Sequence, residues 1–181
     1  MAELDQLTEF AASLHGVRGM HKMLKACALA FDDSNSPMET ILALMLSLPE
    51  GLGGYSLPKP QLNVAVVGYM GKRPQSFVRT GEPLYGVRYG DVVYPDQHLV
   101  VEYLSKAHHE GRWDADALRS NELADAGFDV ISVTPAQVYA PYEMDKVAGQ
   151  IARKLSAELP ELSIAWRERN AGLREQLGLT S

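Results

Sequence analysis

The sequence predicts an α/β fold in which a central mixed β-sheet is flanked by α-helices. Two short runs of β-branched and aromatic residues enclose a turn at 95–98, as in a β-hairpin. A third apolar run, residues 128–133, follows a helical segment, which indicates a crossover and therefore a mixed sheet. Apolar residues at helical spacing predict helices before and after these strands.

Composition limits the class of protein. The chain has 181 residues, of which 46% are hydrophobic and 22% charged, which suits a globular domain with a sizeable core. No apolar run is long enough to span a membrane, and the acidic start is unlike a signal peptide, so we expect no membrane partner. The single cysteine, Cys27, excludes an internal disulfide and a cysteine zinc site, and a reducing cytoplasm is the expected location.

The net charge of −6 gives no overall attraction to nucleic acid, so a nucleic-acid partner would need a local basic surface. Six basic residues in the middle of the chain could form one. They are Lys72, Arg73, Arg79, Arg88, Lys106 and Arg112. Scattered surface charges are the alternative interpretation.

The first part of the chain is predicted to be helical. Apolar residues between 4 and 31 follow helical spacing with one interruption near Gly16 and Gly19, and a polar break follows at 32–35. We therefore expect an N-terminal helical extension. The predicted division of the chain is an extension over residues 1–35, a core domain over 36–160 and a C-terminal helix over 161–181.

The next helix begins with a capping box. Ser36 is the N-cap, Pro37 follows it, and Glu39 stands three residues after the cap. The segment up to Leu48 is strongly apolar and should be buried. Capping alone explains Glu39, and a glutamate at this end of a buried helix could equally point into a site.

A short strand, residues 62–67, leads into a long connection rich in glycine and proline. Long connections in compact domains are often functional. This one carries Lys72, Arg73 and Arg79, so it is a candidate for substrate contact, with an inert surface insertion as the alternative.

The hairpin carries one carboxylate on each strand. A loop centred on 95–98 pairs Tyr94 with Leu99 and, in the same register, Asp91 with Glu102. Like charges directly opposite each other destabilise a sheet, and burial adds to the cost. A Mg²⁺ ion, which binds one or two carboxylates together with water and phosphate oxygens, would offset it. A different register, or an exposed sheet end, is the open alternative.

His108 and His109 follow the hairpin, and a histidine at this place could act as a general acid or base. A helix is then predicted from Asp114 to Ala126, with Gly127 as its stop signal. Further helices are predicted at residues 142–159, ended by Pro160, and at 162–177.

The order of these elements resembles the PD-(D/E)XK restriction-endonuclease-like superfamily. More closely, it is similar to the small bacterial proteins akin to very-short-patch-repair mismatch endonucleases. The likeness covers roughly residues 36–140. It is carried by Ser36-Pro37-Met38-Glu39, Tyr89-Gly90-Asp91, Leu99-Val100-Val101-Glu102, His108-His109, Asp114 with Arg119, and the segment from Leu123 to Val130.

The resemblance implies a restriction-endonuclease-like fold and hydrolysis of phosphodiester bonds, in DNA repair or defence, with Mg²⁺ or Mn²⁺ as cofactor. It assigns the ion to Asp91, and it assigns Glu102 either to the ion or to the orientation of the attacking water. Glu39 would support the site, and His109 would be a general acid or base. DNA is the expected partner, and a protein partner or a homo-oligomer stays open. The residues we assign to nucleic-acid contact are Lys72, Arg73, Arg79, Lys106 and Arg112.

The chain departs from the superfamily at one position that matters. The superfamily's lysine would fall at Leu104, and the closer relatives would have Asp-Gly where this chain has Leu104 and Ser105. Leucine can neither bind metal nor activate water. The alternative is therefore a catalytically decayed member that binds nucleic acid or protein. A third interpretation is an unrelated α/β binding protein with no response to divalent ions.

Overall fold

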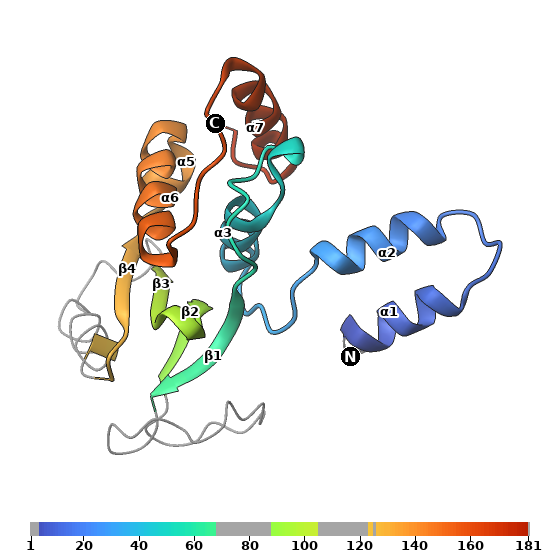
Figure 1. Cartoon of the computed structure of the whole chain (residues 1–181), viewed down its shortest axis with the longest axis horizontal. Coiled ribbons are helices and arrows are strands. Elements are labelled where there is room, and N and C mark those ends of the chain that lie inside the picture. The colour runs from blue at the N-terminus through green and yellow to red at the C-terminus, as the bar shows by residue number, and fades with distance from the viewer. Residues whose placement is uncertain (1–3, 68–87, 105–122, 125, 181) are drawn as a thin grey trace.

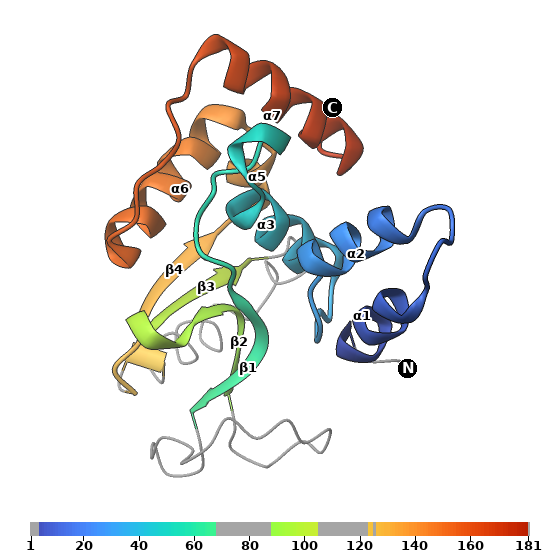
Figure 2. The same cartoon turned by 45° about the vertical axis from the view of Figure 1, so that its right-hand side comes forward.

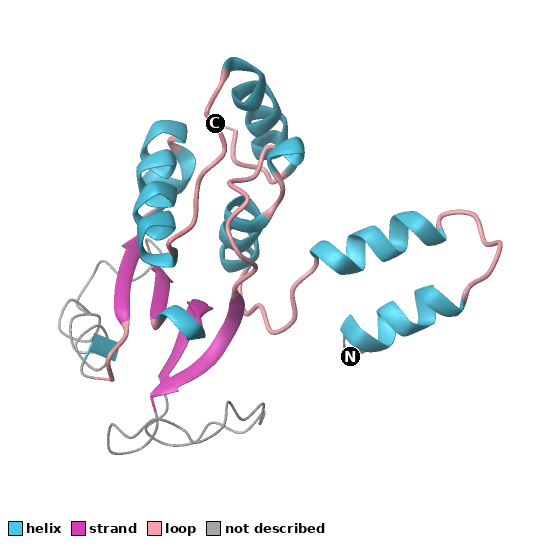
Figure 3. Ribbon diagram, viewed as in Figure 1, coloured by secondary structure: helices cyan, strands magenta, loops and turns pink. Residues whose placement is uncertain are grey.

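The computed structural model describes residues 4–67, 88–104, 123–124 and 126–180. It is a mixed α/β structure, as predicted, and its four-stranded sheet has the order β1-β2-β3-β4 (Figure 3). β1 pairs with β2 and β2 with β3 in antiparallel orientation, whereas β3 and β4 are parallel. The strands are β1 (Gln61–Val67), β2 (Arg88–Tyr94), β3 (Leu99–Tyr103) and β4 (Asp129–Val133).

The α-helices whose bounds the structure describes lie before and after the strands in the sequence. They are α1 (Leu4–Ser13), α2 (Met20–Leu29), α3 (Pro37–Ser47), α5 (Pro135–Tyr139), α6 (Pro141–Leu155) and α7 (Ile164–Gln176). Figures 1 and 2 show α1 and α2 side by side, to one side of the layers that the sheet and the other helices form. None of the helices in the described ranges is long and apolar enough to cross a membrane.

Hydrophobic side chains cover both faces of the sheet. The main cluster joins strand residues such as Leu62, Val92 and Val101 to side chains of α3, α6 and α7. The second cluster joins Val93 and Val100 of the hairpin to residues that include Leu123 and Phe128. Because neighbouring residues of a strand point to opposite faces, the hairpin supplies both clusters from alternating positions.

The predicted hairpin register is confirmed. Tyr94 pairs with Leu99, and Val93 pairs with Val100. A short 3-10 turn, Pro95–Gln97, and a left-handed His98 close the hairpin. Turn chemistry and β-branched side chains, both local features, were therefore sufficient to fix this register.

The crossover to β4 ends as predicted, although most of the expected helix from Asp114 lies outside the described residues. Gly127 has φ 84°, the left-handed conformation of a helix C′ residue. The Gly127 N–H donates to the Ala124 carbonyl and the Phe128 N–H donates to the Leu123 carbonyl, which is the Schellman pattern.

The predicted end of the next helix at Pro160 is wrong. α6 ends at Leu155, because Ser156 adopts a left-handed conformation with φ 50°. The Ser156 N–H still donates to carbonyls of the last turn, those of Ala152 and Arg153. The chain therefore turns before it reaches the proline.

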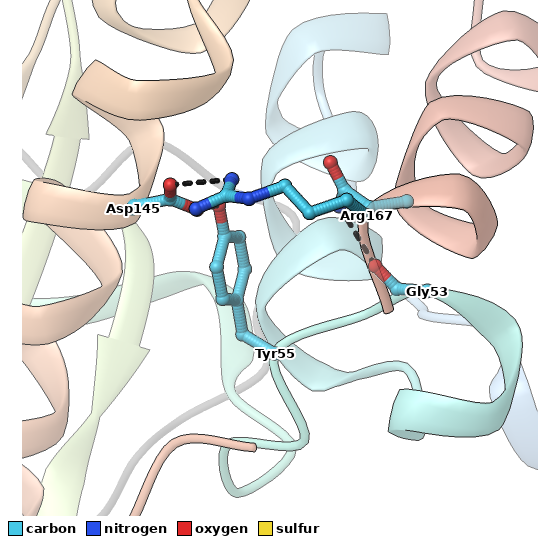
Figure 4. A network of polar contacts seen from close by, with 5 residues as sticks. Gly53, Tyr55, Asp145 and Arg167 are labelled. Atoms are coloured by element: carbon cyan, nitrogen blue, oxygen red, sulfur yellow. Dashed lines mark hydrogen bonds and ion pairs between the residues drawn. The ribbon is translucent and has the colours of Figure 1, made fainter. Parts of the chain in front are cut away.

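α7 is fixed to the loop between α3 and β1 by a polar network. Figure 4 shows the Asp145 carboxylate of α6 meeting the Tyr55 hydroxyl and the Arg167 guanidinium, at 2.8 and 2.7 Å. Trp166, fully buried, donates from Nε1 to the Gly54 carbonyl at 3.1 Å. These contacts make α7 part of the packing around the main cluster rather than an appendage.

Candidate functional site

A row of polar residues crosses the sheet. The pairs Leu62–Val92 and Val64–Gly90 bracket the next positions of β1 and β2, so Asn63 faces Asp91. The register of the hairpin continues from Val92–Val101 to bring Glu102 beside Asp91. On the far side, Glu102 pairs with Ser132 of β4. The row thus runs through all four strands.

The first two strands of this row, β1 and β2, change the direction of their side chains at the same place. Leu62 packs in the main cluster, but Val64, two residues later, packs in the second cluster on the other face. A regular strand would place both on one face. Across from it, a Cβ on Gly90 would meet Val93 and Val100 of the second cluster, whereas Val92 lies in the main one.

The kink is therefore centred on Asn63 and Asp91. Asn63 has φ 50°, a left-handed conformation that is unusual inside a strand. The pairing of β1 with β2 keeps its register through this position, and the register shift between the two strands lies later, between Ala65 and Val67. The kink thus lies at two facing positions that carry a polar side chain among apolar neighbours.

Asp91 is held by the backbone of the neighbouring strand. Its Oδ2 accepts a hydrogen bond of 2.9 Å from the Tyr103 N–H. The regular backbone pairing of β2 with β3 ends at Val92–Val101, so the predicted pair Asp91–Glu102 lies one step beyond the ladder. The Asp91 carboxylate therefore hydrogen-bonds to β3 at the point where the backbone pairing of β2 with β3 has ended.

Glu102 is one of four buried polar or charged residues in the described part of the chain, with 6% of its surface exposed. It follows Val101 of the main cluster, and it is next to Tyr103, whose pKa is raised chiefly by burial and also by Tyr139. A buried carboxylate is costly unless it is paired, hydrogen-bonded or bound to a metal.

Glu39 reaches the row from the first turn of α3. Its side chain is 8% exposed, and its Oε2 accepts from the Asn63 side-chain amide at 2.6 Å and from the Asn35 N–H at 2.9 Å. The Ser36 hydroxyl accepts from the Glu39 N–H at 3.2 Å, so the serine half of the predicted capping box is confirmed. The Glu39 carboxylate, however, turns to the Asn35 N–H and Asn63 rather than to the N–H of Ser36.

The structure thus places three predicted site residues in one neighbourhood. Asp91 of β2 and Glu102 of β3 occupy adjacent strands. Glu39 is hydrogen-bonded to Asn63 of β1, the other neighbour of β2. The other predicted residues lie outside the described residues, so nothing is stated of their placement. These are His109 and the basic residues Lys72, Arg73, Arg79, Lys106 and Arg112.

Leu104, at the position where the resemblance would place a lysine, continues the sheet. Its N–H donates to the Val133 carbonyl at 2.9 Å, and its side chain is half-buried. It extends the pairing of β3 with β4 by one bond. It adds no charge or oxygen ligand beside Glu102.

Asn63 is the site residue that the sequence analysis missed. The only signal was an asparagine inside an otherwise apolar strand. Asparagine is enriched among residues in the left-handed region, and strands disfavour it. A polar residue of this kind at the centre of a strand is therefore a reason to expect a bulge or a kink.

The donor set fits a hard divalent cation. Asp91 and Glu102 offer carboxylate oxygens from adjacent strands, and Mg²⁺ is commonly bound by one or two carboxylates together with water and substrate phosphate. No group of three or more His, Cys, Asp or Glu side chains poised to hold a metal occurs among the residues that the structure describes.

The chain matches no protein-family model, and neither a curated protein nor a solved structure matches it significantly. The functional argument therefore depends on the residues of this chain and on their arrangement.

Proposed function

We propose that this protein is a Mg²⁺- or Mn²⁺-dependent nuclease with a restriction-endonuclease-like fold, which hydrolyses phosphodiester bonds in DNA. The order of the elements supports the proposal: a helix that carries Glu39, then three antiparallel strands, and a fourth strand parallel to β3. Repair or defence against foreign DNA is the proposed setting.

The observation that carries the proposal is the placement of Asp91 and Glu102 on adjacent strands at a kink. Both belong to largely apolar strands, where like charges at facing positions destabilise a sheet. A bound cation would offset the repulsion between the two carboxylates, and cation binding would explain why they lie on adjacent strands. Glu39, linked to the facing strand by Asn63, adds a third carboxylate to the neighbourhood.

In this proposal Asp91 and Glu102 hold the ion, and Glu102 also orients the attacking water. A divalent ion at such a site lowers the pKa of bound water and stabilises the charge that develops on phosphate. The Tyr103 N–H fixes the orientation of the Asp91 carboxylate, which keeps one of its oxygens in place before the ion arrives. His109 as general acid or base, and the basic residues as DNA contacts, complete the proposal.

A second candidate function is a nucleic-acid-binding or protein-interaction module that has lost catalysis. Leu104 favours it, because the position where the superfamily carries a lysine holds an uncharged, half-buried side chain. The net charge of −6 also favours it over tight DNA binding. The two candidates differ in whether the carboxylates bind a metal.

Thermal unfolding with and without Mn²⁺ tests the proposal. Asp91→Asn is the informative variant, because the amide oxygen can still accept from the Tyr103 N–H while the charge is lost. Asp96→Asn, in the exposed hairpin turn, is the matched control. At ten times its Kd, a ligand of the folded state stabilises by about 1.4 kcal/mol, or about 3–6 °C for a domain of this size.

We expect this rise for the wild type and for Asp96→Asn and its loss in Asp91→Asn. Cleavage of plasmid and oligonucleotide DNA with Mn²⁺ is then expected for the first two proteins alone. Metal binding without cleavage would favour the second candidate. No thermal response of the wild type to millimolar Mn²⁺ would overturn the metal-dependent nuclease.

A further inference from the structure

We propose that Asn63 is a positioning residue of this site. Asn63 faces Asp91 across β1 and β2, and its side-chain amide holds the Glu39 carboxylate next to this position. The inference rests on the proposed function, and it adds a residue that neither the motifs nor the resemblance assigned. Its support is independent of the motifs, because it comes from contacts between segments that are distant in the sequence.

The side chain of Asn63 is used at both ends. Its Nδ2 donates to Glu39 Oε2 at 2.6 Å and to the Asp33 carbonyl at 2.7 Å, and its Oδ1 accepts from Asn35 Nδ2 at 2.7 Å. Only a carboxamide can donate and accept in this way from a side chain of this length. The donor facing Glu39 is the end that an aspartate would lack.

The backbone of Asn63 explains why an asparagine can stand at this point of a strand. Its φ of 50° is strained for most residues but is tolerated by asparagine. The same conformation produces the kink at which β1 faces Asp91. One residue therefore sets both the bend of the strand and the contact to the glutamate.

The contact leaves part of Glu39 available. Both hydrogen bonds that hold this carboxylate within the described part of the chain end on Oε2. Oε1 is therefore the oxygen that can turn to a water molecule of a bound ion. A carboxylate fixed by one oxygen keeps the other in a defined position, which is the usual role of residues around a metal ligand.

Capping of α3 does not require Asn63. The serine cap satisfies the Glu39 N–H, and Glu39 in return satisfies the Asn35 N–H. The bond from Asn63 is additional, and it ties the first turn of α3 to β1 across a separation of 24 residues. Its effect should therefore be found in the site more than in the helix.

The test measures Mn²⁺ affinity by isothermal titration calorimetry, which needs no turnover. Asn63→Gly deletes the amide, and glycine accepts a φ of 50°. Ser156→Gly is the matched control, since Ser156 also has φ 50° and lies after α6, away from the row. Loss of such supporting contacts typically weakens metal binding by about 10–100-fold.

We expect Asn63→Gly to bind Mn²⁺ about 10–100-fold more weakly than the wild type, and Ser156→Gly to bind it with unchanged affinity. If Asn63 acts through Glu39, the double variant Asn63→Gly/Glu39→Gln should bind no more weakly than Glu39→Gln alone. Glu39→Gln preserves the size of the side chain, so it also reports on the glutamate should Asn63→Gly fold poorly.

The outcomes separate the two proposals. If the wild type binds Mn²⁺ and folded Asn63→Gly binds it equally well, the role of Asn63 is overturned and the nuclease proposal stands. Additive losses in the double variant would show that Asn63 does not act through Glu39, which also overturns the inference. If the wild type binds no Mn²⁺, the nuclease proposal falls and the inference falls with it.

Discussion

Two regions of this molecule bury polar groups in opposite ways. Of the four buried polar or charged residues in the described ranges, Asn170 and Arg174 belong to the docking of α7, and Glu39 and Glu102 belong to the carboxylate site. In the first region charges of opposite sign are matched. In the second, carboxylates of like sign gather at adjacent positions.

The docking region satisfies most of its polar groups, although Arg174 Nη1 is buried without a hydrogen-bond partner among the described residues. Asp145 receives the Tyr55 hydroxyl and the Arg167 guanidinium, and burial and this hydrogen bond raise the pKa of Tyr55, so it stays a donor. Asn170 donates to the Gly53 carbonyl, and Arg174 donates to the carbonyls of Val138 and Tyr139 at the end of α5. Such a network stabilises a fold because each partner offsets the burial of the other.

The carboxylate site is arranged differently. Within the described part of the chain, the hydrogen bonds that position Glu39 and Asp91 come from the amides of Asn63, Asn35 and Tyr103. Amides orient a carboxylate without neutralising its charge. The comparison sets a region in which a carboxylate meets a guanidinium against a region in which two carboxylates lie on adjacent strands, as the proposed cation site requires.

The largest effect should come from the docking region, at a glycine. Gly53 has φ 86°, and a Cβ there would lie 2.5 Å from the Arg169 carbonyl oxygen. We expect Gly53→Ala to lower the free energy of unfolding by about 2–5 kcal/mol, from left-handed strain and overpacking together. Urea denaturation measures it, in the presence and absence of Mn²⁺.

Gly51→Ala is the control in the same loop, because a Cβ at Gly51 would meet nothing within 4 Å. It should change the stability little, and neither alanine should abolish the Mn²⁺-dependent rise of a protein that stays folded. A small loss for Gly53→Ala would mean that α7 is not held as closely as the contacts indicate.

An effect of intermediate size is expected when one carboxylate in each region is replaced by its amide. Asp145→Asn should cost about 1–3 kcal/mol, because it removes a charge that receives a hydroxyl and a guanidinium at a side chain only 12% exposed. Glu102→Gln, in metal-free buffer, should cost nothing or add up to about 1 kcal/mol, because it relieves repulsion with Asp91. Urea denaturation in the presence of a chelator compares the two.

The proposed difference between the two regions would be contradicted if Glu102→Gln lost as much stability as Asp145→Asn. The buried glutamate would then be a structural group, like the aspartate of α6. The expected pattern is the reverse, with a further difference when Mn²⁺ is added. Asp145→Asn should keep the metal-dependent gain and Glu102→Gln should lose it.

The parts of the fold that the sequence predicts are those determined by neighbours in the chain. The hairpin register follows from strand-forming residues around a four-residue turn, and the stop at Gly127 follows from a single glycine. The mixed sheet followed from the same strands. By contrast, the residue that ends α6 is Ser156, whose left-handed conformation has no strong local signal.

The candidate site was predictable only in part for the same reason. Asp91 and Glu102 are eleven positions apart in one hairpin, so their neighbourhood follows from its register. Asn63 meets Glu39 from another element, at the point where β1 faces β2 across a long connection. Trp166 is likewise fixed by Gly54, 112 positions away. Contacts between residues so distant in the sequence depend on the assembled fold, and the periodicity of apolar residues does not predict them.

The smallest effect compares two helix caps that are alike in chemistry and differ in location. The Ser36 hydroxyl accepts from the Glu39 N–H at the start of α3, and the Ser163 hydroxyl accepts from the Trp166 N–H at the start of α7. Replacing either serine by alanine should cost about 1 kcal/mol, because each leaves one N–H of a first turn without its cap.

The metal response should distinguish these two caps. Ser36 anchors the turn that carries Glu39, so Ser36→Ala should also weaken Mn²⁺ binding, by a smaller factor than Asn63→Gly because the Asn63 and Asn35 contacts remain. Ser163→Ala should leave the affinity unchanged at an equal loss of stability. Urea denaturation and calorimetric titration of both variants measure the two quantities separately. Equal affinities for Mn²⁺ would show that the first turn of α3 is independent of the site, since stability alone cannot separate two caps of the same strength.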